Sequence, residues 1–335
     1  MSRNYRLLVK NAKQVVLICN NGEKFMTKHE ILNLCVIENG SIVIGRVGGC
    51  SHSSPGGRLL HGRAPGGGGD PLHGGAHPGC GPPELLSSLS SRLLRMQRAG
   101  TTLVECKSGY GLDLHTELKM LQVIEEARNT LPINISSTYC GAHAVPKLKE
   151  QMSAGTLRVD NIDVFCEEGV FDLSSTRRIL QAGKDLGLNI NFHGDELHPM
   201  NSAQLGAELG ASAISHLEEP RARDMLEAGV IVALGSDFNP NAYCCSMPIV
   251  MHLACVNMRM SMPEALAAAT INAAYALGCS HTHGSLEVNK HGDLLVLNTT
   301  RWEHLIYQLG GHQELIRYVI IKGNIVVDND KTLDL

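Results

Sequence analysis

The densest group of ionisable residues lies in residues 191–199, NFHGDELHP, where His193, Asp195, Glu196 and His198 fall within six positions. Imidazole and carboxylate groups are ligands for a borderline cation such as Zn²⁺. Such an ion lowers the pKa of water to about 7 and so produces a nucleophile at neutral pH. A carboxylate that is not a ligand can carry the proton to a leaving nitrogen. These residue types therefore indicate metal-assisted hydrolysis.

Other chemically capable residues follow apolar runs further along the chain. They are Tyr110 in KSGYG, His143 in TYCGAH, His216 in AISH and Asp237 in VALGSD. In an α/β barrel the active site collects at the carboxyl ends of the strands, so these residues would meet near residues 191–199. We expect His193 and Asp237 to bind the metal and Glu196 to carry the proton. His216 would stabilise the developing oxyanion.

The same residues also have structural interpretations. A single histidine at a strand end is commonly a hydrogen-bonded core residue, and Asp237 before FNP suits a turn. His198 precedes a proline, and we interpret it as a helix-entry residue. His281 and His283 form an HxH pair in SHTHG, which reads as a surface turn, and we interpret that pair as structurally incidental.

The elements that must position these groups alternate between strand and helix from residue 101 onward. The β-branched run TTLVECK precedes LHTELKMLQVIEEAR, whose Leu114, Leu118, Leu121 and Ile124 recur at helical spacing. Repeated units of this kind predict parallel strands that are buried on both faces, and hence an α/β fold. The two ends of the chain are β-rich instead, so we expect them to meet in one small β unit.

Residues 47–83 do not fit this alternation, because they contain 13 Gly and 6 Pro in 37 positions. Gly is costly to order and Pro cannot donate to a ladder, so we expect no buried strand there. The segment also contains His52, His61, His73 and His77. Their irregular spacing does not predict a metal cluster. The run GGGG lacks a following Lys-Ser/Thr, which argues against a phosphate loop.

Composition limits the classes of partner. The 335 residues carry a formal net charge of −4, with 29 Lys+Arg against 33 Asp+Glu and without basic blocks, so we expect no nucleic-acid partner. No apolar run approaches the roughly 20 residues that cross a bilayer, and the first residues do not resemble a signal peptide. The 11 cysteines include no CxxC pair and read as reduced thiols. We therefore expect a cytoplasmic protein without a membrane partner.

Several motifs together resemble the imidazolonepropionase family of the amidohydrolase superfamily. They are KSGYGL, YCGAHAVP, NFHGDELHP, ISHLEE, LGSDFNPNAYC, SMPIVMHLAC and LAAATINAAYALG. The resemblance covers about residues 1–46 and 84–335, with gaps. It implies a TIM-type (β/α)₈ barrel over residues 84–283 and a small β-sandwich formed by residues 1–46 and 284–335.

The resemblance also implies a reaction and a set of roles. The reaction is hydrolytic opening of 4-imidazolone-5-propanoate to N-formimidoyl-L-glutamate with one Zn²⁺ or Fe ion per subunit, and a homodimer is compatible with it. His193 and Asp237 correspond to metal ligands, while Glu196 corresponds to an acid/base that also contacts the substrate ring. His216 corresponds to a catalytic residue. The implied substrate contacts are Tyr110, His143, Glu196 and Asn239.

The chain also departs from this family. The family's first barrel strand ends in an HxH pair of metal ligands followed by a substrate-binding arginine, and residues 47–83 occupy that place without either motif. Strand 7 is also missing, between SHLEE and PRARDMLEAG. The strand that ends at Asp237 would then lack both neighbours, so its backbone would need other partners. Two alternatives follow: an inactive or non-catalytic remnant of the same fold, or another cyclic amidohydrolase or deaminase.

Overall fold

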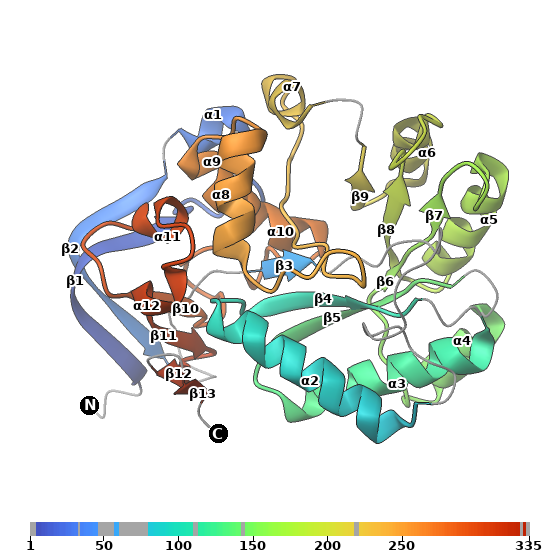
Figure 1. Ribbon diagram of the computed structural model, residues 1–335, viewed down its shortest axis with the longest axis horizontal. Helices are drawn as coiled ribbons and strands as arrows, with labels where there is room; N and C mark the ends of the chain where they lie inside the picture. The colour runs from blue at the N-terminus through green and yellow to red at the C-terminus, as the bar shows by residue number, and fades with distance from the viewer. Residues whose placement is uncertain are drawn as a thin grey trace.

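The computed structural model describes residues 5–32, 34–45, 57–59, 80–109, 113–141, 145–217, 221–328 and 331–332, with a curved parallel sheet at their centre (Figure 1). Its strands are β3 (Gly57–Leu59), β4 (Leu103–Lys107), β5 (Asn134–Tyr139), β6 (Asn161–Ile162), β7 (Phe165–Cys166), β8 (Asn189–Gly194) and β9 (Ala213–His216). The order is β3-β4-β5-β6-β8-β7, β9 pairs with β8, and these ladders are parallel. The predicted α/β class is confirmed.

Helices connect most successive strands, as parallel pairing requires. They are α2 (Pro82–Arg98), α3 (Leu114–Thr130), α4 (Val145–Ser153), α5 (Leu173–Lys184) and α6 (Ser202–Leu209), followed after β9 by α7 (Ala222–Glu227), α8 (Met247–Asn257), α9 (Met262–Ala268) and α10 (Ile271–Ala276). Within the described residues, none is both long and apolar enough to span a bilayer.

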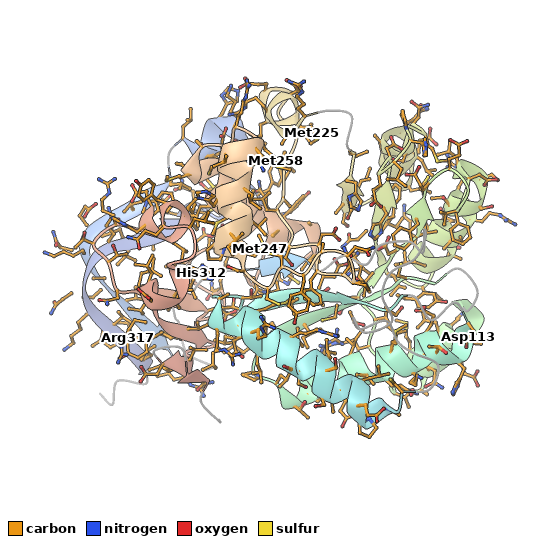
Figure 2. All side chains as sticks on the ribbon, in the orientation of Figure 1. Asp113, Met225, Met247, Met258, His312 and Arg317 are labelled. Carbon is orange, nitrogen blue, oxygen red and sulfur yellow. The ribbon has the colours of Figure 1, made fainter. Side chains whose placement is uncertain are left out.

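Helix α3 shows how the sequence specifies these elements. Its predicted apolar face is confirmed, since Leu121 and Ile124 are buried and Leu118 is half-buried. The helix begins after Asp113, which is labelled in Figure 2. Its side chain accepts a 3.0 Å hydrogen bond from the backbone N–H of Thr116. The buried face packs against β5, and α5 and α6 pack in the same way against β8.

Residues 47–83, in which we expected no buried strand, do contribute the short strand β3. Gly57, Arg58 and Leu59 pair with Leu103, Val104 and Glu105 of β4. A strand at the edge of a sheet can pair through its backbone groups alone, whatever its side chains. Here the pairing supplies hydrogen-bond partners for backbone N–H and C=O groups at the edge of β4. The expectation of a missing first strand is corrected accordingly, because three residues lie beside β4 in its place, without an HxH motif. The four histidines of this segment lie outside the described residues.

The predicted strand that ends at Asp237 is also wrong, because residues 231–238 form no strand. The N–H of Leu234 donates instead to the carbonyl of Ala268, at the end of α9, at 3.0 Å. The carbonyl of Val232 accepts a 3.0 Å hydrogen bond from Nδ2 of Asn272 in α10. The predicted need for other backbone partners is confirmed for these groups, and the described sheet is open between β3 and β9. Residues 218–220, near the proposed gap of strand 7, lie outside the described residues.

The two ends of the chain form antiparallel sheets. One contains β1 (Tyr5–Ile18) and β2 (Cys35–Gly45), with α1 (Lys28–Ile31) between them, and the other contains β10 (Leu294–Leu297), β11 (Ile316–Ile321), β12 (Asn324–Asp328) and β13 (Lys331–Thr332), with α11 (His304–Tyr307) and α12 (His312–Leu315) after β10. Ile44 of β2 shares a buried cluster with Leu294 and Ile320 from the second sheet. The two sheets therefore pack together, as Figure 1 shows at the left. The domain boundaries remain a prediction.

Candidate active site

His193 and His216 lie side by side at the carboxyl ends of two paired strands. His193 is in β8 and His216 ends β9, and Gly194 pairs with His216 across the ladder. The two imidazole rings have centroids 5.3 Å apart. His216 Nε2 lies 3.7 Å from Glu196 Oε2, and both of these side chains are 14% exposed. Two histidines and a carboxylate therefore gather at the carboxyl ends of β8 and β9, with His216 and Glu196 partly exposed and His193 buried.

Asp237 belongs to the same group although it does not end a strand. Burial raises the pKa of Asp237, while the nearby charges of His216 and His193 lower it and the charge of Glu196 raises it. Three other predicted site residues are thus close enough to influence this carboxyl group. Asn239 is buried and donates from Nδ2 to the carbonyl of Asp237 at 2.8 Å, so its amide holds the turn on which Asp237 sits.

The other predicted substrate contacts cannot be placed. Tyr110 and His143 lie outside the described residues. The strands that precede them, β4 and β5, run parallel and end on the same side of the sheet as β8. Their roles, and a substrate contact by Asn239, remain predictions.

The backbone is strained around this group. Asp195, His216, Leu217 and Asp237 have positive φ angles of 52°, 73°, 55° and 44°. Non-glycine residues in this region cost on the order of 1–3 kcal/mol each, and such residues cluster at functional sites. The surrounding packing therefore holds the carboxyl ends of β8 and β9 in a conformation that the local sequence alone would not choose.

Sequence reasoning did not find Asp163, which lies between β6 and β7 behind His193. Asp163 Oδ1 lies 2.9 Å from His193 Nδ1 and accepts a 3.1 Å hydrogen bond from the His193 backbone N–H. Burial alone would raise the pKa of Asp163, but the positive charges of His193 and Lys107 hold it well below its usual range. A carboxylate in this position fixes the ring orientation of a metal-binding histidine.

Lys107 and Glu105 of β4 extend this buried network. Lys107 Nζ donates to Asp163 Oδ2 at 2.8 Å and to Glu105 Oε1 at 3.0 Å. Burial would lower the pKa of Lys107, but the charges of Asp163 and Glu105 raise it well above its usual value. The only signal in the sequence was a pair of charged residues inside the apolar run LVECK, since charges in a buried strand must be paired.

The remaining ionisable residues of NFHGDELHP hold the loop. Asp195 Oδ1 accepts hydrogen bonds from the backbone N–H groups of Met200 and Ser202, at 3.1 and 3.3 Å. His198 Nδ1 lies 3.0 Å from Glu167 Oε1, which agrees with the structural interpretation of His198. Of the four ionisable residues in this motif, His193 and Glu196 therefore face the site, while Asp195 and His198 hold the turn.

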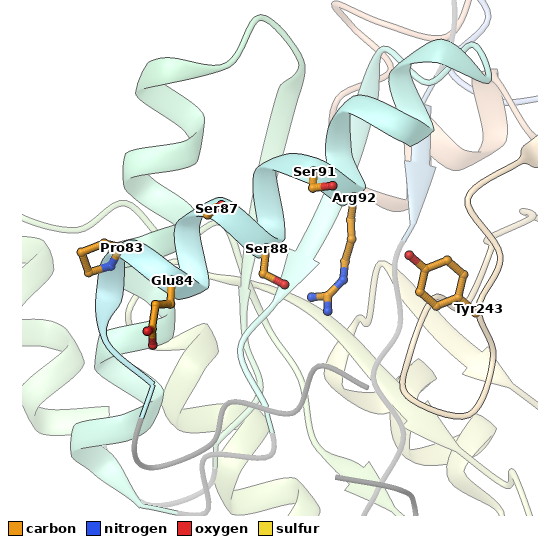
Figure 3. Close-up of a pocket in the computed structure, with 7 residues that line it drawn as sticks. All are labelled: Pro83, Glu84, Ser87, Ser88, Ser91, Arg92 and Tyr243. Carbon is orange, nitrogen blue, oxygen red and sulfur yellow. The ribbon is translucent and has the colours of Figure 1, made fainter. Parts of the chain in front are cut away.

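An open pocket of about 610 Å³ adjoins the loop that follows Asp237 (Figure 3). It is lined by Pro83, Glu84, Ser87, Ser88, Ser91, Arg92 and Tyr243. The Arg92 guanidinium lies over the ring of Phe238 with its carbon 5.7 Å from the centroid, and Arg95 donates to the Tyr243 hydroxyl at 2.8 Å. Contacts from α2 therefore hold the loop that carries Asp237 and Asn239.

The donor chemistry of the site fits a zinc or iron ion. Because Nδ1 of His193 is engaged by Asp163, Nε2 is the nitrogen with which His193 would bind the ion. Asp237 supplies a carboxylate, the second type of ligand that such an ion accepts. In the part of the chain that the structure describes, three potential metal-ligand atoms also lie within 4.8 Å of one another at a different place. They belong to His283, His291 and Asp293.

Comparison with known proteins identifies the family. The amidohydrolase family model matches residues 177–326. A Danio rerio protein named "Probable imidazolonepropionase" is 54% identical over 433 aligned positions, which cover 100% of both chains. A Homo sapiens protein of the same name is 52% identical, with 97% of this chain and 99% of that protein covered. The aligned length exceeds the 335 residues here, so the Danio rerio protein contains residues without a counterpart in this chain.

Solved structures give the same fold at low identity. A triazine hydrolase variant has a TM-score of 0.67 and 15% identity, covering 97% of this chain and 95% of that one. An amidohydrolase from a Sargasso Sea sample has a TM-score of 0.66 and 13% identity, with 98% and 94% covered. The fold is therefore the TIM-like α/β fold of the amidohydrolases. Because relatives more than 50% identical align over their full length, this chain belongs to the imidazolonepropionase family of that superfamily.

Proposed function

We propose that this protein hydrolyses 4-imidazolone-5-propanoate to N-formimidoyl-L-glutamate, a step of histidine degradation, in the cytoplasm. Its family membership supports this reaction. The observation that carries the site assignment is the gathering of His193, His216, Glu196 and Asp237 around the carboxyl ends of β8 and β9. The described sheet would extend to the (β/α)₈ barrel of the family, with the terminal sheets as its β-sandwich.

In this proposal His193 Nε2 and Asp237 bind one Zn²⁺ or Fe ion per subunit. Such an ion supplies the Lewis acidity that makes water nucleophilic near neutral pH. Asp163 keeps the proton of His193 on Nδ1 and fixes the ring, because its carboxylate accepts from both the ring and the backbone. Lys107 and Glu105 in turn fix Asp163.

Glu196 moves the proton. It takes a proton from the attacking water as the water oxygen bonds to the ring carbonyl carbon, and it returns that proton to the ring nitrogen when the C–N bond breaks. His216, 3.7 Å from Glu196, donates to the carbonyl oxygen as negative charge develops there. Tyr110, His143 and Asn239 contact the substrate in this scheme.

Replacing Glu196 with Gln tests the assignment. We expect turnover of imidazolonepropionate to fall by about 10²–10⁴-fold while the bound metal is unchanged, because Glu196 carries a proton and is not a ligand. Glu168→Gln is the matched control, since Glu168 is an exposed carboxylate on a nearby loop. Loss of metal from Glu196→Gln would show that Glu196 is a ligand.

Product analysis tests the reaction itself. Incubation with imidazolonepropionate should yield N-formimidoylglutamate, identified by mass. Release of ammonia from a different cyclic substrate would instead favour a deaminase. The absence of turnover in protein supplied with metal would favour a non-catalytic remnant.

A further inference from the structure

His283, His291 and Asp293 form a buried group that the proposed reaction does not use. The exposed fraction is 5% for His283 and 0% for Asp293, and His291 is half-buried. The interpretation of SHTHG as a surface turn is therefore wrong for His283, although His281 is exposed. The turn packs closely on α10, because a Cβ on Gly284 would lie 2.7 Å from Cα of Ile271.

The three side chains converge on one point. One ligand atom from each lies within 4.8 Å of the others. His283 Nε2 is 3.1 Å from His291 Nδ1 and 3.8 Å from Asp293 Oδ2. Ligand atoms about 2.0–2.1 Å from a tetrahedral Zn²⁺ lie roughly 3.4 Å apart. Shifts of a few tenths of an ångström would bring these two distances to the tetrahedral spacing, and the third pair of atoms already lies within 4.8 Å.

The protons of the group can be arranged to receive a cation. His283 Nδ1 lies 2.9 Å from the Thr282 hydroxyl, to which it can donate, so we assign the lone pair of His283 to Nε2. His291 then carries the proton that fills the 3.1 Å gap between the two rings. When a metal ion binds both nitrogens, this proton moves to Nε2 of His291, so that both imidazoles remain neutral ligands.

Burial raises the pKa of Asp293 to about 7, although its hydrogen bonds and the charge of Lys322 act to lower it. Its Oδ1 accepts from the backbone N–H of Lys322 at 2.7 Å, and its Oδ2 accepts from Asn134 Nδ2 at 3.1 Å. A buried carboxylate is costly unless it is paired with a cation or binds a metal. The Oδ2 atom that faces His283 is thus oriented by these bonds, and a cation bound there would hold the carboxyl group in its charged form.

This group lies at the other end of the sheet from His193. Asn134, which bonds to Asp293, is the first residue of β5, whereas His193 is near the last residue of β8. In barrels of this type the carboxyl ends carry the chemistry and the amino ends serve stability. An ion here would connect the turn after α10, the segment before β10, β5 and the β11–β12 turn.

We propose that His283, His291 and Asp293 bind a structural divalent transition-metal ion, with Zn²⁺ as the best match and a fourth position for water. Two imidazoles and a carboxylate suit Zn²⁺ better than Mg²⁺ or Ca²⁺, which prefer oxygen ligands. The site is separate from the ion proposed for catalysis and does not depend on the proposed reaction.

Cobalt titration of the full chain carrying His193→Asn tests this site alone, because that change removes a proposed active-site ligand. We expect one Co²⁺ per chain, with visible absorption of tetrahedral intensity, and a thermal midpoint that rises with Co²⁺ concentration. Adding His283→Asn should weaken binding by more than about 100-fold, since losing even an outer partner of a ligand costs 10–100-fold.

His281→Asn is the matched control, because His281 belongs to the same HxH pair but is exposed. It should leave the Co²⁺ affinity and the midpoint shift unchanged. If His283→Asn does not fold, His291→Asn at its half-buried position gives the same comparison. The proposal is overturned if His193→Asn binds no Co²⁺, or if His281→Asn weakens binding as much as the cluster variants do.

Discussion

Replacing Asp163 with Asn tests whether a buried carboxylate behind His193 prepares it for metal binding. The substitution keeps the shape of the side chain and removes the charge that lies 2.9 Å from His193 Nδ1 and 2.8 Å from Lys107 Nζ. Loss of such an outer partner typically weakens metal binding or activity by 10–100-fold. This corresponds to about 1.4–2.8 kcal/mol of metal-binding free energy.

Glu105→Gln is the control for this experiment. Glu105 accepts from the same Lys107 at 3.0 Å and is as buried as Asp163, whereas Asp163 also lies 2.9 Å from His193 Nδ1. Each variant loses a hydrogen bond to a charged group, so each should lower the free energy of unfolding by about 1.5–3 kcal/mol. Only Asp163→Asn should also weaken Zn²⁺ binding.

The assay is competition for Zn²⁺ with a chromophoric chelator, in chains that also carry His283→Asn so that the amino-end cluster does not contribute. Thermal unfolding of the same samples gives the stability difference. Equal Zn²⁺ affinity in the Asp163→Asn and Glu105→Gln proteins would refute the reasoning, because the network would then serve the fold alone.

Three further changes have defined outcomes. Gly194→Ala should lower the free energy of unfolding by about 1–3 kcal/mol in denaturant titration, because its Cβ would lie only 2.2 Å from Ser202 Oγ; unchanged stability would contradict this contact. Arg223 and Ser261 lower the pKa of Glu264 although burial alone would raise it, so Glu264 stabilises the fold above pH 4.5 and this contribution disappears as the pH falls through its folded pKa. Glu264→Gln should therefore destabilise the protein at pH 7, and thermal unfolding at decreasing pH should show this difference disappear below the folded pKa of Glu264. Finally, dialysis against a weak chelator should remove the active-site ion and the activity together, and added Zn²⁺ should restore the ion and the activity. The reason is that typical catalytic zinc sites have three protein ligands, whereas only two are assigned here. Retention of the ion and the activity would point to additional ligands.

The histidines of the site could be predicted because their spacing follows from strand geometry. His193 and His216 each come at the end of an apolar run, and the carboxyl ends of parallel strands meet at one edge of a sheet. The loop roles of Asp195 and His198 could not be separated from the site roles of their neighbours by sequence. That separation depends on Glu167, which is 31 positions from His198 and reaches it only in the folded chain.

The buried networks could not be predicted, because their members come from distant parts of the chain. Lys107 and Asp163 are 56 positions apart, and Asn134 and Asp293 are 159 apart. Sequence shows only that charged residues interrupt apolar runs. The pairing of these charged residues depends on the register of β4, β5 and β6. No local sequence pattern predicts that register.

The segment before Asp237 forms no strand, yet Asp237 lies close to the other residues of the site. Its composition is that of a buried strand, yet residues 231–238 form none. The buried side-chain amide of Asn272 replaces some of the hydrogen bonds that a neighbouring strand would make. It donates to the carbonyls of Val232 and Met26, at 3.0 and 2.9 Å, and accepts from the Met26 N–H at 2.8 Å. The buried side chains of Val232 and Leu234 still pack into the main core. Hydrophobic burial therefore keeps the segment in the main core, while its hydrogen bonds come from the end of α9 and from α10. We infer that the position of Asp237 relative to His193 depends on the packing of these helices rather than on strand register.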